Sequence, residues 1–154
     1  MKTPRFYLDT SVFGGYFDTE FEVPTLRLFA DCKRGLGIIL VSDIVVEELS
    51  NAPRRVRDLA LLTSELTVEA VKESAESVEL ADAYLTANVL LRNHYDDCRH
   101  VALASVARAD VLISWNFRHI VRFDKIRAFL AVNLVRGYAP LEIRSPLEVS
   151  LDEN

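Results

Sequence analysis

Short apolar runs alternate with longer segments of helical periodicity in this chain of 154 residues, and this alternation limits the fold more than any single motif. The runs predict buried strands at 5–8, 38–41, 66–68, 111–115 and 141–143. Apolar residues at helical spacing predict helices at 24–34, 43–50, 75–91, 98–108 and 120–136, with a further helical piece from Pro53 to Leu62. Strands without a polar face, joined by helices, form a parallel sheet that helices cover on both sides. We therefore expect one three-layer α/β domain over residues 1–147, followed by a polar tail over 148–154.

Local signals predict where some of these elements begin and end. Ser42 and Asp43 follow the second strand, and residues of these types favour the first position of a helix. Gly137 is expected to stop the helix before it. The stretch 13–17 predicts an aromatic turn, in which Gly14 and Gly15 supply backbone freedom.

Composition excludes several classes of protein. Hydrophobic residues make up 50% of the chain and charged residues 27%, with only 5 Gly and 5 Pro, which rules out a disordered or collagen-like chain. No apolar run approaches the roughly 20 residues of a membrane span, and Asp9 precedes any signal-peptide core, so we expect a cytoplasmic protein without membrane contact. Cys32 and Cys98 are too far apart in sequence for a disulfide framework or a zinc knuckle. The net charge of −5 argues against a basic coat protein but leaves room for an enzyme that acts on nucleic acid.

Four polar residues stand where an open α/β sheet binds its ligands, beyond the carboxyl ends of the strands. Asp9 follows the first strand, and Asn116 follows the strand at 111–115. Glu48 lies about two turns into the helix after the second strand, and Asp97 lies in the first turn of an alanine-rich helix. We expect all four to surround one cleft. Crowded carboxylates repel unless a cation is bound, and hard oxygen ligands favour Mg²⁺ or Mn²⁺, so the set indicates phosphodiester chemistry.

Simpler explanations exist for each acid taken alone. Asp9 could form an Asx turn, Asp97 could stabilise a helix start together with Asp96, and Glu48 could face solvent. Other chemistries have less support, because the chain has no P-loop, no dinucleotide-binding glycine motif and no hydrolase nucleophile elbow. The histidines lack metal-ligand spacing, so surface or capping roles are expected for His94, His100 and His119.

Four blocks of sequence occur in a characteristic order: 7–11 (Tyr7-Leu8-Asp9-Thr10-Ser11), 41–49, 96–104 and 109–116. Together they resemble the PIN-domain family, which includes the VapC-like toxins of toxin–antitoxin pairs. The resemblance implies an α/β/α sandwich with a mainly parallel five-stranded sheet and a metal-dependent ribonuclease for single-stranded RNA. It implies Asp9, Glu48 and Asp97 as ligands of Mg²⁺ or Mn²⁺. The hydroxyl beside the first acid matches Ser11 or Thr10.

Asn116 departs from the family pattern, because many relatives carry an Asp at this position and so complete a four-acid site. A neutral amide offers one carbonyl oxygen, which favours one bound ion over two. We still expect Asn116 to belong to the catalytic set.

Basic residues supply candidate contacts for RNA phosphates, although each is also explained as a solvated surface charge. The candidates are Arg99, Arg118, Arg122, Arg54 and Arg55. The leading hypothesis is a metal-dependent endoribonuclease that forms a homodimer and acts as the toxin partner of an antitoxin protein. The alternative is a catalytically weak PIN module that binds RNA or a protein.

Overall fold

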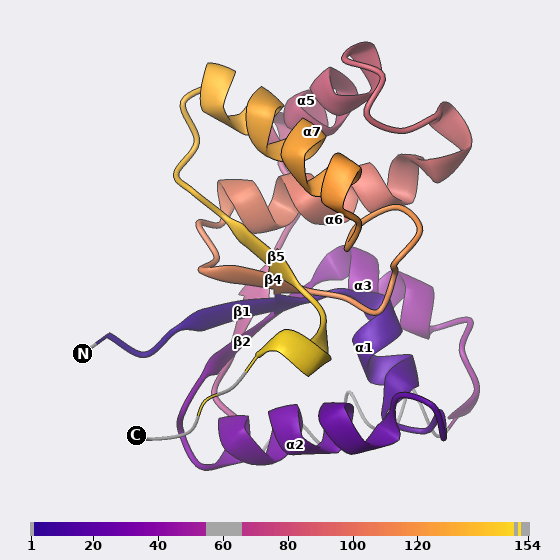
Figure 1. Cartoon of the computed structure of the whole chain (residues 1–154), viewed down its shortest axis with the longest axis vertical. Coiled ribbons are helices and arrows are strands. Elements are labelled where there is room, and N and C mark those ends of the chain that lie inside the picture. The colour runs from indigo at the N-terminus through magenta and orange to yellow at the C-terminus, as the bar shows by residue number, and fades with distance from the viewer. Residues whose placement is uncertain (1, 55–65, 150, 152–154) are drawn as a thin grey trace.

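The computed structural model of the chain describes residues 2–54, 66–149 and 151 (Figure 1). The strands are β1 (Arg5–Leu8), β2 (Ile38–Ser42), β3 (Val68–Val71), β4 (Val111–Ile113) and β5 (Glu142–Arg144). They form one sheet in the order β3-β2-β1-β4-β5, and every neighbouring pair is parallel. The chain builds the sheet outward from β1 to β3 and then resumes on the other side of β1 with β4. The strand order therefore reverses between β1 and β4, which is the position where open α/β sheets bind ligands.

Helices cover both faces of this sheet. The helices are α1 (Thr10–Gly15), α2 (Glu22–Lys33), α3 (Asp43–Leu49), α5 (Ala75–Thr86), α6 (Tyr95–Val106) and α7 (Phe123–Val135), with short 3₁₀ turns η2 (Arg92–His94) and η3 (Pro146–Glu148). Figure 1 shows α5, α6 and α7 on one side of the sheet and α1 and α2 on the other. This arrangement confirms the expected three-layer sandwich with a parallel five-stranded sheet.

Two separate cores explain why the strands are apolar on both faces. Along β1, Phe6 and Leu8 pack into the core that contains Phe29 of α2. Tyr7 points the other way and packs into the core that contains Phe129 of α7. Successive side chains of a strand alternate between faces, so a strand buried on both sides needs an unbroken apolar run.

The prediction of an aromatic turn over residues 13–17 is wrong in part, because Thr10–Gly15 forms a helix. Gly15 is needed there for close packing rather than for backbone freedom. A Cβ atom at Gly15 would lie 2.6 Å from the indole nitrogen of Trp115, which real contacts do not allow. The glycine thus lets the start of the chain pack directly against the segment after β4.

Other boundaries differ by less. The helix expected over 75–91 ends at Thr86, because Asn88 takes a left-handed backbone conformation with φ of 60°. Ser42 caps α3 as expected, and its Oγ accepts the amide proton of Val45 at 3.2 Å.

The predicted division at residue 147 stays a prediction. Val149 and Leu151 pack, partly buried, against the core on the α2 side. No helix in the described part of the chain is long and apolar enough to cross a bilayer. Arg55, Arg57 and nearly all of the helical piece expected after Pro53 lie outside the described residues.

Candidate active site

The four residues selected from the sequence reach the same end of the sheet from four different elements. Asp9 directly follows β1, and Asn116 lies three residues beyond β4, the neighbouring strand. Glu48 comes from α3 and Asp97 from the first turn of α6. The amide nitrogen of Asn116 lies 3.2 Å from a carboxylate oxygen of Asp97, and Asp97 is near enough to Asp9 for its charge to raise the pKa of Asp9. The structure thus brings these residues together, and a cleft around them stays a prediction.

Asp9 is buried and held by side chains rather than by the backbone. It is 4% exposed, and its carboxylate accepts hydrogen bonds from Ser11 Oγ at 2.5 Å and Ser114 Oγ at 2.8 Å. Although Asp9 precedes α1, its carboxylate makes no capping hydrogen bond to that helix, so a capping role does not explain it. Ser11 is the hydroxyl beside the acid, whereas Thr10 Oγ1 is buried and bonds to none of the described residues. Ser114 was not selected from the sequence.

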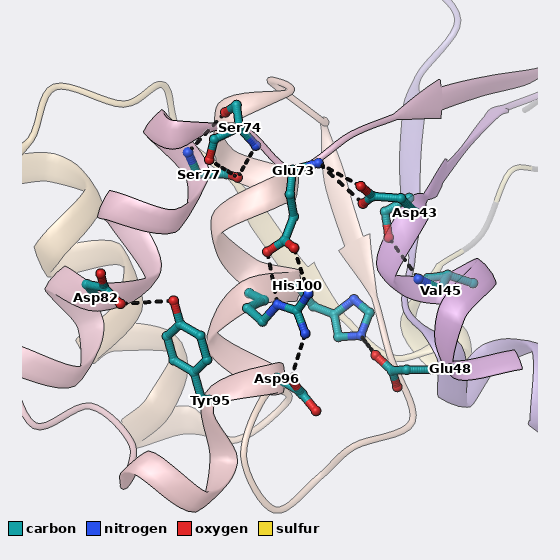
Figure 2. Close-up of polar contacts among 12 residues, drawn as sticks. Asp43, Val45, Glu48, Glu73, Ser74, Ser77, Asp82, Tyr95, Asp96 and His100 are labelled. Atoms are coloured by element: carbon teal, nitrogen blue, oxygen red, sulfur yellow. Dashed lines mark hydrogen bonds and ion pairs between the residues drawn. The ribbon is translucent and has the colours of Figure 1, made fainter. Parts of the chain in front are cut away.

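His100 lies inside the protein between Glu48 and Tyr7. The surface role expected for it is therefore wrong. The imidazole is 3% exposed and lies between Glu48 Oε1 and the Tyr7 hydroxyl, each 2.7 Å from a ring nitrogen. Figure 2 shows the contact between His100 and Glu48. The Tyr7 hydroxyl donates its own proton to Ser42 Oγ at 2.8 Å, so it accepts from His100. Because the Glu48 carboxylate also accepts, this pattern of contacts favours a proton on both ring nitrogens of His100.

Asp97 is positioned by the loop that follows β4. Asn116 donates to Asp97 Oδ1 from its amide nitrogen, and its own side-chain oxygen accepts the backbone amides of Arg118 at 3.2 Å and His119 at 3.0 Å. The His119 Nδ1 atom lies 3.5 Å from Asp97 Oδ2, and the ring of His119 stacks on that of His94 with centroids 3.8 Å apart. Asn116 therefore holds the loop and the carboxylate in one arrangement.

The pKa values of two carboxylates in the site, and that of the nearby imidazole, lie above their ordinary values. Burial raises the pKa of Asp9, and the charge of Asp97 adds to this, against opposing effects of His100 and the two serines. Burial also raises the pKa of Asp97, to which the charge of Glu48 contributes. Burial lowers the pKa of His100, but its bond to Glu48 and the surrounding acids outweigh this, so the pKa is raised.

The donor set suits a hard divalent cation. Asp97 lies near enough to Asp9 and to Glu48 for their charges to interact, and each carboxylate oxygen has a second lone pair beyond the hydrogen bond it accepts, which leaves sites for a ligand. Mg²⁺ and Mn²⁺ prefer carboxylate and water oxygens, and a bound cation would offset the raised pKa values of Asp9 and Asp97. Asp9, Glu48 and Asp97 are thus the residues that could hold such an ion.

Arg99 is already paired within the protein. Its guanidinium binds both carboxylate oxygens of Glu73, at 2.6 and 2.9 Å, and Asp96 at 2.9 Å. These pairs tie α6 to the segment between β3 and α5. An RNA contact by Arg99 stays a prediction and would compete with these bonds.

The other selected arginines are more exposed. Arg122 pairs with Asp124 at 2.8 Å. Arg118 is exposed beside Asn116, and its guanidinium has no ion-pair partner among the described residues. Arg54 is also exposed, and Arg55 lies outside the described residues. Of the set, Arg118 stands closest in sequence to the candidate site.

Comparison with known proteins supports the fold. No protein-family model matches the sequence, and no curated protein matches it significantly. The structure is similar to the sarcin–ricin loop cleaving toxin VapC20 of Mycobacterium tuberculosis, with a TM-score of 0.56, 14% identity, and coverage of 74% of this chain and 92% of that one. It is also similar to VapBC2 of Rickettsia felis, solved on a DNA fragment from its promoter, with a TM-score of 0.60, 16% identity, and coverage of 92% and 98%.

Proposed function

From a chain with the PIN-domain fold of VapC-like proteins, we propose a metal-dependent endoribonuclease that cleaves single-stranded RNA. The observation that carries the proposal is the reversal of strand order beside β1, where Asp9 follows the strand and interacts electrostatically with Asp97, which in turn interacts with Glu48. Each acid comes from a different element, and two of them have raised pKa values that a cation would relieve. Asp9 is buried and does not cap α1, and a bound cation would offset the cost of its buried charge.

The residues divide the work in the following way. Asp9, Glu48 and Asp97 hold Mg²⁺ or Mn²⁺, which when bound lowers the pKa of water and offsets charge on the phosphoryl group. Asn116 acts as a positioning residue, because its amide donates to Asp97. Ser11 orients the carboxylate of Asp9. Arg118, which is exposed beside Asn116, contributes a contact to an RNA phosphate.

The test is cleavage of a single-stranded RNA with Mg²⁺, with Mn²⁺ and with a chelator. Asp97→Asn removes a ligand charge and should slow cleavage by at least about 100-fold, because metal catalysis is worth several kcal/mol. Asp96→Asn is the matched control, since Asp96 is an exposed neighbour that bonds Arg99 instead. If both variants cut RNA like the wild type, or if the chelator has no effect, the proposed function is wrong.

We also propose that the chain is the toxin of a toxin–antitoxin pair, with a small protein antitoxin as its partner. Support comes from the two similar proteins, one named as a toxin and the other as a VapBC pair. Expression of the wild type in a bacterial host should then arrest growth, whereas Asp97→Asn should not. If cells grow equally with both proteins, the toxin proposal is wrong, and the nuclease proposal is unaffected.

A homodimer is the assembly that we propose for the chain in the cytoplasm. Two large apolar side chains next to each other in α7, Leu134 and Val135, are 79% and 88% exposed, so they offer an apolar contact for a second copy of the chain. Light scattering should give about twice the 17.4 kDa of one chain. A single 17.4 kDa species at micromolar concentration would contradict it.

The alternative function is a PIN module that binds RNA without cutting it. The neutral Asn116 is the feature that favours this alternative, since it leaves the site one charge short of four acids. RNA that binds to the wild type and remains intact with either metal would support it.

A further inference from the structure

Two histidines that the sequence did not predict as ligands, His94 and His119, lie beside Asp97 of the candidate active site. His94 ends η2, His119 lies between β4 and α7, and Asp97 stands in the first turn of α6. One ligand atom of each residue lies within 4.8 Å of the other two. We call these three residues the histidine cluster.

The spacing of the histidine cluster is that of ligands around one metal ion. Two ligand atoms bound to a tetrahedral zinc ion at about 2.0–2.1 Å lie about 3.4 Å apart. His119 Nδ1 and Asp97 Oδ2 are 3.5 Å apart, which is longer than an ordinary hydrogen bond. The ligand atom of His94 lies within 4.8 Å of those of the other two residues, and its ring has to turn from its stack on His119 to bind the same ion.

The cluster is also held in place by the surrounding backbone. Asn116 bonds both Asp97 and the backbone of His119, so it fixes two of the three ligands relative to each other. The third ligand, His94, is anchored by its backbone amide, which donates to the Leu91 carbonyl at 2.9 Å. Its ring stacks on that of His119, so one of the two imidazoles has to turn before both face the same ion. Asp97 and the backbone of His119, which Asn116 holds in position, lose less freedom when the site binds a metal ion.

The two histidines line a pocket of about 240 Å³ together with Arg122 and Lys125, whereas Asp97 is not among its lining residues. The pocket gives both imidazoles access to a metal ion from solvent.

We propose that His94, Asp97 and His119 form a binding site for a zinc-class transition metal, separate from the magnesium ligands except for Asp97. Imidazole nitrogen suits Zn²⁺, whereas Mg²⁺ prefers oxygen alone. Because Asp97 belongs to both sets, zinc at the histidine cluster withdraws a ligand from the magnesium site. Zinc then inhibits the RNA cleavage proposed above, and this second consequence rests on the proposed function.

The first experiment measures binding without RNA. Untagged protein is titrated calorimetrically with Zn²⁺ in the presence of excess Mg²⁺. Wild type should bind one equivalent, and His94→Ala and His119→Gln should each weaken binding by at least about tenfold. Asn93→Ala, an exposed neighbour on η2, is the control for disturbance of the turn. Unchanged binding in both histidine variants, or no binding by the wild type, overturns the proposal.

The second experiment separates this site from the nuclease site. Asp9→Asn should lose cleavage and keep zinc binding, because Asp9 is outside the histidine cluster. His94→Ala should cut RNA with Mg²⁺ like the wild type but need at least about tenfold more Zn²⁺ for half inhibition. Zinc binding that depends on the histidines in a protein that cuts no RNA would refute the function and keep the site. Cleavage with equal zinc sensitivity in wild type and His94→Ala would refute the shared ligand.

Discussion

The inner and outer halves of the candidate site are built in different ways. The inner half consists of Asp9, Glu48 and His100. Glu48 contacts the buried imidazole of His100, and Asp9 accepts from the hydroxyl groups of Ser11 in α1 and Ser114 after β4. The outer half consists of Asp97, Asn116 and His119, and it depends on a loop after β4. Asp97 and His119 keep about a fifth of their side-chain surface exposed, whereas Asp9 and His100 are almost wholly buried and Glu48, at the edge of the inner half, is 34% exposed. Asp9 and His100 therefore carry a cost of charge burial, and the outer half stays open to ligands.

The largest difference between the halves should appear when each loses one acid. Asp9→Asn and Asp97→Asn should both reduce metal-dependent RNA cleavage by at least about 100-fold. Asp9→Asn should also stabilise the metal-free protein by about 1–2 kcal/mol, and more than Asp97→Asn does, because burial raises the pKa of both acids but Asp9 is the more deeply buried. Chemical denaturation in a chelator measures this. Equal stability changes in the two variants would contradict the division into halves.

Removal of a histidine ring should lower the stability of the protein, and more so in the inner half than in the outer half. His100→Ala removes the bonding partner of both Glu48 and Tyr7 inside the protein, so we expect the free energy of unfolding to fall by about 2–4 kcal/mol. His119→Ala removes a partly exposed ring and should change it by about 1 kcal/mol or less. Urea unfolding of both variants in a chelator compares them, and similar losses would show that His119 is as deeply built in as His100.

The pH dependence of stability should depend on the inner acid. Asp9 has a pKa above its ordinary value of 3.8, so the folded state binds its proton more tightly than the unfolded state does. Its stabilising contribution is complete below about pH 3.8 and is lost as the pH rises through the raised value. The advantage of Asp9→Asn over the wild type should therefore grow from pH 4 toward neutrality and shrink when Mg²⁺ is added. Thermal melts across this range measure the gap, and a constant gap would contradict a raised pKa.

The smallest effect is expected from Asn116→Asp in the outer half. The new carboxylate can still accept the backbone amides of Arg118 and His119, so the loop should stay in place. It loses the donor to Asp97 and adds a charge, which should tighten Mn²⁺ binding by up to about tenfold. Calorimetric titration with Mn²⁺ measures the change. Unaltered affinity would place Asn116 outside the surroundings of the metal.

The sequence predicted the sheet and the acids because both follow from local patterns. An unbroken apolar run indicates a strand buried on both faces, and the residue after it stands at the edge where ligands bind, which is how Asp9 was found. His100 was missed because its partners, Glu48 and Tyr7, are brought to it only by the packing of α3 and β1 against α6. Local spacing carries no information about such contacts. The helix α1 was missed because paired glycines indicate a turn, whereas Gly15 is required by the approach of Trp115.

The contact of Trp115 with Gly15 has an optical consequence. Trp115 is the only tryptophan of the chain, it is buried beneath the stacked ring of Phe21, and its backbone amide donates to Ser11 Oγ at 2.9 Å. The same Ser11 hydroxyl bonds Asp9, and the next residue along the chain is Asn116. The single indole fluorophore is therefore one hydrogen-bonded residue away from each half of the candidate site, and its emission is an intrinsic, label-free signal for whatever occupies that site.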